Sequence, residues 1–557
     1  MTASPASAAA GELLAELIGS GVRDVVLSPG SRSQALALAA ASLARVGVLR
    51  VHVRIDERVA GFTALGIARE TRLPVAVICT SGTAVGNLLP ATMEAFHSGV
   101  PLLLLTADRP PELRGVAANQ ATVQPGIFGS FVRWQKDATT PVPDDGAATS
   151  WAGLGREAVA AALGLTGSGI TGVAGPVHLN LPARAPLSDD TAAVAHPGPA
   201  PARSEPTATT LRRGPRTVVI AGADAGADAE AVSHAGGWPL IAEIVSGSRY
   251  GRLLVHGYRA LLGDEALGGR VERAIVFGHP TLSREVAALL SRDDVEVVAV
   301  RSGGQAVNLN GRSQPADAIS VEAGAADRQW LGAWMNASAA AAIDLSAPAP
   351  DQAGLYAADS AARLTAVRAE LEAVRRPVDR ELLADAVWRA TWPHDRLVFG
   401  SSRLVRVADQ VLGGKKVPVH ANRGLAGIDG TIATAIGIAV ASQAESTPGV
   451  TRVLLGDLAF LHDVGALLLP VDEPTPRIQV IVGNDGGGTI FDGLEVAASA
   501  PSADLDRVFY TPHSAELGEL ASAYGWDYTQ VATRSALDQA LTSPVTRPQI
   551  IEVPLER

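Results

Sequence analysis

Short apolar runs alternate with amphipathic segments along the chain. Apolar residues recur at helical spacing from Leu13 to Ile18, and residues 25–27 then form a short, wholly apolar run. A period of 3.6 predicts a helix, whereas a short apolar run between turn residues predicts a buried strand. The alternation continues, with strands expected at 51–55, 75–79 and 101–106 and a helix at 59–68. Apolar strands separated by helices predict a parallel sheet that is covered on both faces.

Stretches rich in proline and small residues divide the chain into three such units. The expected boundaries are 1–185 for the first unit, 186–215 for a linker, 216–346 for a central unit, 347–378 for a linker with charged helices, and 379–557 for the last unit. The predicted fold class is therefore α/β, with three domains built on parallel sheets.

The first and last units contain similar sequence patterns. Ile55-Asp56 precedes a helix that contains the run ALGIA at 64–68, and Ile428-Asp429 precedes one that contains AIGIA at 435–439. A strand and a polar, glycine-containing loop follow in both units. The spacing differs by a few residues, but the pattern indicates two related domains that flank a third.

Charge and cysteine content exclude several classes of function. Lys and Arg total 46 against 57 Asp and Glu, a net charge of -11, so a basic surface for nucleic acid is not expected. The single cysteine, Cys79, excludes a disulfide framework and lies in an apolar strand, where a core role is expected. We find no signal peptide in 1–11 and no apolar run long enough for a bilayer, which predicts a cytoplasmic protein without membrane insertion.

Two polar loops follow consecutive strands in the last unit. Asp457 ends one expected strand and Asn484 ends the next, and the separation (484 − 457 = 27) fits one helix between neighbouring parallel strands. Both loops would then meet at one sheet edge. A carboxylate, an amide oxygen and a backbone carbonyl suit Mg²⁺. We expect a metal site of Asp457, Asn484 and Gly486, and the run of glycines leaves Asp485 as an alternative to Asn484.

These loops resemble the diphosphate and Mg²⁺ motif of thiamine-diphosphate (ThDP) enzymes, usually Gly-Asp-Gly and then Asn-Asn. Leu458 stands here in place of the last glycine and Gly483 in place of the first asparagine. The resemblance implies ThDP and a divalent metal ion, Mg²⁺ or Mn²⁺ in its place, as cofactors. It also implies a set of cofactor-binding residues: Ser81, Gly82, Ile428, Gly456, Asp457, Leu458 and Asn484. Among these, the bulky Ile428 would hold the cofactor bent.

A ThDP enzyme also needs a glutamate from the other type of domain, and Glu57 stands where one is expected, at the start of a helix. Taken alone, such a carboxylate is common at helix N-termini, where the helix dipole favours it. The resemblance implies that Glu57 is catalytic, and that its carboxyl hydrogen-bonds a pyrimidine nitrogen of ThDP and promotes loss of the C2 proton. Burial should raise the pKa of this carboxyl.

An ordered set of further segments is similar to one branch of these enzymes, the 2-succinyl-5-enolpyruvyl-6-hydroxy-3-cyclohexene-1-carboxylate synthases of menaquinone biosynthesis. The segments are 28–33, 55–58, 80–85, 106–112, 118–120, 422–424, 427–430 and 456–458. The likeness is close in the first and last thirds and holds in outline in the middle. It implies a transferase that decarboxylates 2-oxoglutarate and adds the remainder to isochorismate. It also implies a homodimer or homotetramer with active sites between chains.

Each of these two substrates carries two carboxylates, which arginine side chains bind bidentately. The resemblance implies these substrate-binding residues: Ser31, Arg32, Arg109, Asn119, Gln120, Arg284, Ser402, Arg406, Arg423, Ile490, Phe491 and Leu494. At Arg284 the family often has a basic pair, whereas here Glu285 follows a single basic residue.

Three alternative functions remain open at this point. A ligase of the acetohydroxyacid synthase type would use pyruvate, whose single carboxylate needs fewer arginines. A dinucleotide-dependent oxidoreductase is suggested by the run 221–226 after a strand, but that run lacks the Gly-x-Gly-x-x-Gly spacing. A non-catalytic binding protein is the third, although intact Glu57, Asp457 and Asn484 argue against it.

Overall fold

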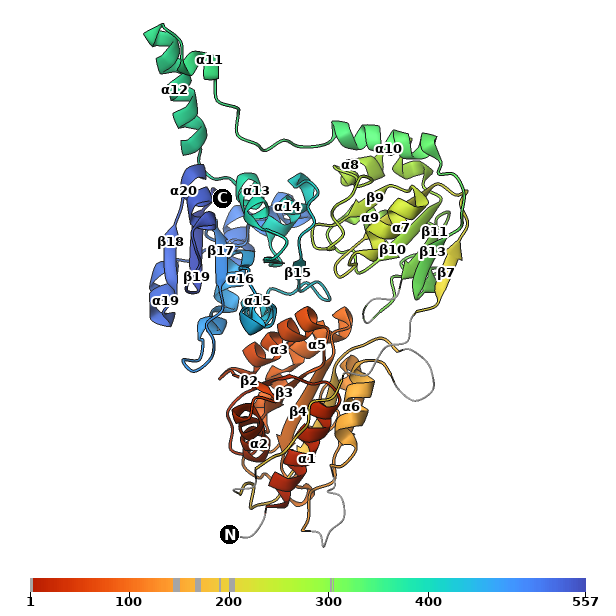
Figure 1. Ribbon diagram of the computed structural model, residues 1–557, viewed down its shortest axis with the longest axis vertical. Helices are drawn as coiled ribbons and strands as arrows, with labels where there is room; N and C mark the ends of the chain where they lie inside the picture. Colours follow the sequence, from red (N-terminus) through yellow and green to blue (C-terminus); the bar gives the residue numbers. More distant parts are fainter. Residues whose placement is uncertain are drawn as a thin grey trace.

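The computed structural model describes residues 4–143, 151–165, 172–189, 192–199, 206–300, 303 and 305–557. Three parallel sheets, each flanked by helices, follow one another along the chain, and we call them the first, central and last domains (Figure 1). The N-terminus lies at the far end of the first domain, and the C-terminus lies beside the last. None of the helices in the described ranges has the length and apolar character needed to cross a bilayer.

The first domain is built on a six-stranded sheet in the order β2-β1-β3-β4-β6-β5. Its strands are β1 (Asp24–Leu27), β2 (Arg50–Val53), β3 (Val75–Cys79), β4 (Leu102–Asp108), β5 (Trp134–Asp137) and β6 (Val177–Pro182). Its helices are α1 (Pro5–Gly19), α2 (Gln34–Arg45), α3 (Glu57–Thr71), α4 (Thr83–Asn87), α5 (Leu89–Ser98) and α6 (Leu154–Ala162). Every residue of β1, β3 and β4 is buried, as expected for a parallel sheet between two helical layers.

The central domain has a five-stranded sheet in the order β12-β11-β10-β8-β9. Its strands are β8 (Thr217–Ala221), β9 (Leu240–Ala242), β10 (Arg273–Phe277), β11 (Glu296–Val300) and β12 (Gln314–Ala316). Its helices are α7 (Asp228–Gly236), α8 (Tyr258–Gly263), α9 (Arg284–Leu290) and α10 (Arg328–Ala340). The expected linker is not wholly irregular, because β7 (Ala208–Leu211) pairs with β13 (Ala318–Val321) beside this sheet. The exact domain boundaries stay predictions.

The last domain repeats the strand order of the first, as β15-β14-β16-β17-β19-β18. Its strands are β14 (Arg396–Phe399), β15 (Val419–Ala421), β16 (Thr451–Gly456), β17 (Ile478–Asn484), β18 (Asp527–Gln530) and β19 (Gln549–Pro554). Its helices are α13 (Arg380–Ala390), α14 (Arg403–Val411), α15 (Thr431–Ser442), α16 (Asp457–His462), α17 (Glu495–Ser499), α18 (Ser502–Leu505), α19 (Leu517–Tyr524) and α20 (Arg534–Thr542). Before it, α11 (Gln352–Leu355) and α12 (Ser360–Arg375) project away from the sheets (Figure 1). The shared topology confirms that the first and last domains are related, as their similar sequence patterns predicted.

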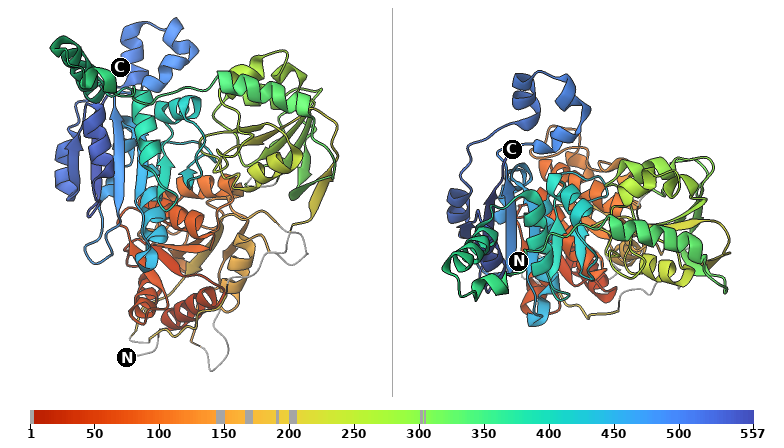
Figure 2. Two further views of the ribbon diagram at one scale, coloured as in Figure 1. Left: turned by 45° about the horizontal axis from the view of Figure 1, so that its top comes forward. Right: turned by 90° about the horizontal axis from the view of Figure 1, so that it is seen from above.

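The two helices that contain these similar patterns, α3 and α15, pack against each other where the first and last domains meet (Figures 1 and 2). One hydrophobic core runs through both domains and includes Phe62 and Leu65 of α3 together with Ile432 and Ile436 of α15. Burial of this continuous apolar surface fixes the two related domains relative to each other.

Candidate active site

The two loops of the predicted metal site lie side by side at the carboxyl edge of the last sheet. Strands β16 and β17 are paired neighbours, with Gly456 opposite Gly483, so Asp457 and Asn484 both stand at the ends of adjacent strands. Asp457 is the first residue of α16 and is 2% exposed. Its burial raises the pKa of the carboxyl, and a hydrogen bond from His513 works in the opposite direction.

His513 is a neighbour of Asp457 that the sequence analysis did not identify. Its Nε2 lies 2.9 Å from Oδ2 of Asp457, while Oδ1 accepts a hydrogen bond from the backbone N–H of Leu458 at 2.9 Å. The histidine lies 56 positions away in a loop without a motif, so only the folded chain reveals the contact.

Asn484 and Asp485 differ in what surrounds them. The Asn484 amide oxygen accepts from the Gly486 N–H at 3.0 Å, and its Nδ2 donates to Glu552 at 2.7 Å. The Asp485 carboxylate is already paired with Arg380 at 2.7 Å and also accepts from the Thr489 hydroxyl. The positive charge of Arg380 therefore competes with a cation for Asp485, which favours Asn484 as the second ligand.

The donor set at this edge fits a hard divalent cation. It offers the Asp457 carboxylate, the Asn484 amide oxygen and the backbone carbonyl of Gly486, all of them oxygen donors of the kind that Mg²⁺ binds. Within the described ranges, no group of three His, Cys, Asp or Glu side chains could hold a metal. A cation here would therefore depend on amide and carbonyl oxygens and on oxygens from a bound phosphate group.

Glu57 begins α3, directly after the helix N-cap Asp56. The Asp56 carboxylate accepts from the N–H groups of Arg58 and Val59 at 2.8 and 3.3 Å, which fixes the first turn of the helix. Glu57 is half-buried, and its Oε2 accepts from Nδ2 of Asn87 at 3.4 Å. Among the described residues, no hydrogen bond or ion pair of Glu57 reaches the loops of the last domain.

The Cys79 thiol, at the end of β3, is free and fully buried, which confirms the expected core role. Burial and, secondarily, the charge of Glu57 raise the pKa of this thiol. A thiol held protonated in this way is a poor nucleophile, so Cys79 takes no part in the chemistry.

The loop after β3 brings three of the predicted residues together. The Ser81 hydroxyl donates to the backbone carbonyl of Gln120 at 2.8 Å, and the Gln120 side chain donates back to the Ser81 carbonyl at 3.0 Å. Gly82 has a φ of +87°, and a Cβ there would lie 3.1 Å from Cγ of Gln120. Its N–H donates to buried Gln124 at 2.9 Å, a contact that the sequence did not predict.

Arg32 and Arg109 lie near each other at the carboxyl edge of the first sheet. Burial and, next, the positive charge of Arg109 lower the pKa of Arg32. Arg109 donates to the backbone carbonyl of Asn119, and Ser31 lies exposed beside Arg32. Within the described chain, Nε of Arg32 and Nη1 of Arg109 are buried without a hydrogen-bond partner. Two buried cationic donors without an acceptor are suited to an anionic ligand.

A second pair of arginines lies in the last domain. Ser402 is the N-cap of α14 and accepts from the Leu404 N–H at 3.2 Å, and Arg406 donates to the Ser402 carbonyl at 3.0 Å. Arg423 is 3% exposed, and burial lowers its pKa; burial and the charge of Arg259 do the same for Arg406. Both cations are therefore held in surroundings where a negative charge would stabilise them.

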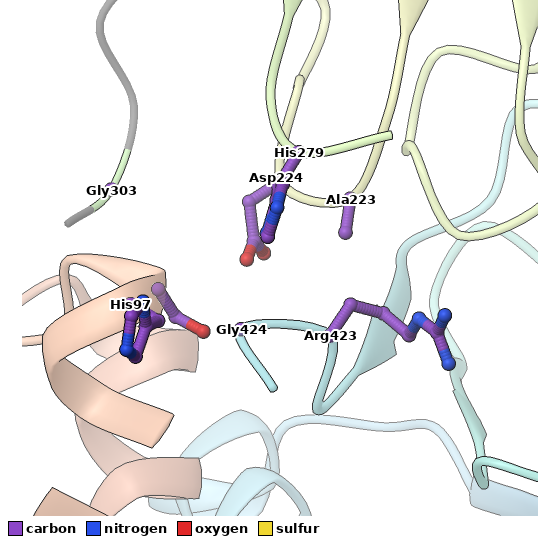
Figure 3. A pocket seen from close by; sticks show the side chains of 8 residues that line it. His97, Ala223, Asp224, His279, Gly303, Arg423 and Gly424 are labelled. Carbon is purple, nitrogen blue, oxygen red and sulfur yellow. The ribbon is translucent and has the colours of Figure 1, made fainter. Parts of the chain in front are cut away.

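The main chain of Arg423 borders a small pocket where the three domains meet. Figure 3 shows Asp224 and His279 facing the pocket from the central domain and His97 from the first domain. The Arg423 side chain extends away from these residues, so its guanidinium faces a different space.

The remaining predicted substrate residues are more exposed. Arg284 is the exposed first residue of α9. Ile490 and Phe491 lie in a short 3₁₀ turn after the glycine run, where Phe491 packs edge-on against Phe509 at a ring separation of 5.2 Å. Leu494 is 42% exposed at the end of this turn. Ile428, an apolar candidate of the cofactor site, is 37% exposed in the loop before α15.

The run 221–226 after β8, which contains two glycines, packs against the loop around Pro280 and does not form a dinucleotide-binding turn. A Cβ on Gly222 would lie 2.0 Å from the backbone nitrogen of Pro280, so the two loops touch directly. Ala223 and His279 also pair as an isolated antiparallel bridge. This close contact at Gly222, together with the missing Gly-x-Gly-x-x-Gly spacing, argues against the oxidoreductase hypothesis.

The chain has two topologically equivalent α/β domains, with a third between them in sequence. One of the two carries the site of carboxylate, amide and carbonyl oxygens, and the other carries a glutamate at the start of a helix. This arrangement defines a thiamine-diphosphate enzyme. Residues 8–128 match the family model for the N-terminal TPP binding domain of thiamine pyrophosphate enzymes, the same cofactor under its other name. The solved structure of benzoylformate decarboxylase from Polynucleobacter necessarius has the same fold, with a TM-score of 0.65 and 16% identity over 100% of this chain and 99% of that one.

Curated relatives identify the family within this class of enzymes. The chain is similar to proteins named 2-succinyl-5-enolpyruvyl-6-hydroxy-3-cyclohexene-1-carboxylate synthase in Leifsonia xyli subsp. xyli and in Clavibacter michiganensis subsp. michiganensis. The identities are 54% and 52%, and both alignments cover 100% of this chain and 97% of the relative. The relative of that name in Kineococcus radiotolerans is 43% identical over 99% of this chain and 96% of its own length. The chain therefore belongs to the family of these synthases, as the sequence motifs predicted.

Proposed function

We propose that this protein decarboxylates 2-oxoglutarate and joins the remaining four-carbon unit to isochorismate. The products are CO₂ and 2-succinyl-5-enolpyruvyl-6-hydroxy-3-cyclohexene-1-carboxylate, a step of menaquinone biosynthesis. The observation that carries this proposal is the 54% identity to a synthase of that name over the whole chain. The two pairs of arginines, each with one buried and one half-buried member, support a reaction whose substrates are both dicarboxylates.

Asp457, Asn484 and the Gly486 carbonyl are the residues that would hold Mg²⁺, and through it the diphosphate of ThDP. Gly456, Leu458, Ser81, Gly82 and Ile428 would form the rest of the cofactor site. When bound, ThDP supplies an electron sink for the bond that breaks between the 2-oxo carbon and its carboxylate. Glu57 would hold and return a proton at its carboxyl oxygen, opposite a ring nitrogen of the cofactor.

The arginines of this chain would bind and orient the two dicarboxylates. Arg32 and Arg109, with Ser31, Asn119 and Gln120, form one group in the first domain; Arg406 and Arg423, with Ser402, form another in the last. Cations at two separate places can hold both substrates by their carboxylates and bring the reacting carbons together. Ile490, Phe491 and Leu494 would exclude water from the new carbon–carbon bond, and Arg284 would bind at the rim.

We infer that the two halves of the cofactor site come from different chains of a homo-oligomer. Glu57 makes no described contact with Asp457 or Asn484 in one chain, although the cofactor must touch all three. We infer that Glu57 of one chain meets the metal loops of a second chain, so that each active site lies between two protomers.

The proposal is tested by mixing the purified protein with ThDP, Mg²⁺, 2-oxoglutarate and isochorismate and following the loss of isochorismate. Loss that requires both ThDP and 2-oxoglutarate is the expected result. If the protein instead consumes pyruvate alone, with no loss of isochorismate, the acetohydroxyacid synthase type of ligase is supported. If the protein binds ThDP but consumes no isochorismate with any 2-oxo acid, the proposed reaction is wrong.

A further inference from the structure

The guanidinium of Arg423 is held by a residue of the central domain. Its Nε donates to the Thr281 hydroxyl at 2.9 Å, and its Nη2 donates to the Thr281 carbonyl at 3.2 Å. Nη1 donates to the Ser401 hydroxyl at 3.2 Å. A guanidinium has five N–H donors, so three are engaged and two remain, one on each terminal nitrogen. Two such donors are the pair that binds a carboxylate bidentately.

Thr281 is itself fixed by a buried carboxyl group. The N–H groups of Thr281 and Leu282 both donate to Oε1 of Glu243, at 2.9 and 2.7 Å. Glu243 directly follows β9 and is fully buried, and Thr281 lies in the loop between β10 and α9. Two neighbouring segments of the central domain therefore set the place of the threonine hydroxyl that Arg423 contacts.

The main chain around Arg423 is anchored separately, from the first domain. The buried Glu94 of α5 accepts from the N–H groups of Gly424 and Leu425 at 2.9 and 2.8 Å. Arg69 of α3 lies 3.5 Å from the same carboxylate. Because these bonds hold the loop without Thr281, removing the Thr281 hydroxyl should leave Nε of the guanidinium without its partner while the loop keeps its place. The guanidinium then keeps only its bonds to the Thr281 carbonyl and to Ser401.

We propose that Thr281, held by Glu243, is a positioning residue that orients the Arg423 guanidinium toward a substrate carboxylate. The central domain then takes part in substrate binding through Thr281, although it carries neither the catalytic glutamate nor the metal loops. An arginine side chain has many rotamers, and fixing its fork before the substrate arrives lowers the entropy lost on binding. This inference rests on the proposed role of Arg423 in binding a dicarboxylate substrate.

The test compares Thr281→Val, which keeps the shape of the side chain but removes the acceptor, with Thr281→Ser, which retains a hydroxyl. Thr210→Val is the matched control, since Thr210 is an exposed threonine of β7 whose hydroxyl pairs only with Ser320 among described residues. Steady-state rates are measured with each substrate varied in turn, and thermal unfolding is recorded for every variant.

In Thr281→Val we expect KM for one of the two carboxylate substrates to rise on the order of tenfold, with a smaller change in kcat. Thr281→Ser should restore most of the affinity, and Thr210→Val should behave as the wild type. Unchanged KM values in Thr281→Val overturn the proposal. So does an equal loss in Thr281→Ser, which would assign the effect to packing.

A crystal structure of cofactor-free Thr281→Val separates this proposal from the proposed function. If the wild type consumes no isochorismate, the reaction is wrong, and the structure still decides the positioning. A guanidinium turned away from its wild-type direction, with Gly424 still bonded to Glu94, supports the proposal. A guanidinium that stays in place on the carbonyl of residue 281 and on Ser401 overturns it.

Discussion

Gly66 of α3 and Gly437 of α15 lie at reciprocal positions in the contact between the first and last domains. A Cβ on Gly66 would be 2.0 Å from the carbonyl oxygen of Thr434, and a Cβ on Gly437 would be 2.1 Å from that of Thr63. Each glycine follows the threonine of its own helix by three residues, so the contact has a local twofold character. The two helices approach closely enough that neither position has room for a side chain.

Gly66→Ala should therefore destabilise the docking of the two domains. The added methyl group meets backbone that cannot move aside like a side chain, and overpacking of this kind costs about 1–3 kcal/mol. Thermal unfolding measured by calorimetry should show a lower Tm for the variant. The control is Gly332→Ala in α10, where a Cβ would meet nothing within 4 Å. That change should be neutral or stabilising by about 0.5–1 kcal/mol, and an equal loss in both variants would contradict the close-packing argument.

Much of this architecture could be predicted from the sequence, because buried parallel strands appear in it as apolar runs. The strand at 75–79 matches the structure to the residue, and the paired loops at Asp457 and Asn484 lie at neighbouring strand ends as expected. Strand β7 was missed because its four residues gain their order only by pairing with β13, more than 100 positions later.

The candidate site was predictable where a motif carries it and not where tertiary contacts complete it. His513, Gln124 and Thr281 touch Asp457, Gly82 and Arg423 through folding alone, from loops without repeated or glycine-rich patterns. The sequence likewise does not reveal which serine hydroxyl contacts Arg423. Ser402 caps a helix with its hydroxyl, while its neighbour Ser401 meets the guanidinium.

Glu57→Gln should lose most turnover while still binding ThDP and Mg²⁺. The amide preserves the shape of the side chain but cannot exchange a proton with the cofactor, and general acid–base steps contribute roughly 10²–10⁴-fold to the rate. The measurements are kcat for isochorismate loss and ThDP binding by titration calorimetry. Glu372→Gln, on exposed α12, is the matched control and should be fully active. Full activity in Glu57→Gln would remove Glu57 from the mechanism.

Variants at Asn484 and Asp485 decide which residue completes the metal site. Asn484→Ala removes an amide oxygen that no cation of the described residues contacts, so the Mg²⁺ concentration for half-maximal ThDP binding should rise at least roughly tenfold. Asp485→Asn weakens the pair with Arg380 and should change the Mg²⁺ requirement much less. Fluorescence quenching by ThDP, titrated with Mg²⁺, measures both. The reverse order of effects would assign the ligand to Asp485.

Glu243→Gln should gain stability relative to the wild type as the pH rises. Full burial is the main cause that raises the pKa of Glu243 from 4.5 to about 8, and the charge of Asp409 adds to it. The folded state then keeps a proton that the unfolded chain has released, so stability from this group is complete below about pH 4.5 and is lost as the pH rises to about 8.

Glutamine does not titrate, and its carbonyl oxygen can accept from Thr281 and Leu282 as the carboxyl does. The difference in Tm between Glu243→Gln and the wild type should therefore grow in favour of the variant between pH 5 and pH 8, and level off above. Calorimetry across this range measures it, with exposed Glu372→Gln as the control whose difference stays flat. If the Tm difference instead shifts toward the wild type with rising pH, Glu243 is ionised in the folded protein. Its carboxylate would then hold the Thr281 loop as an anion that the Arg423 charge compensates.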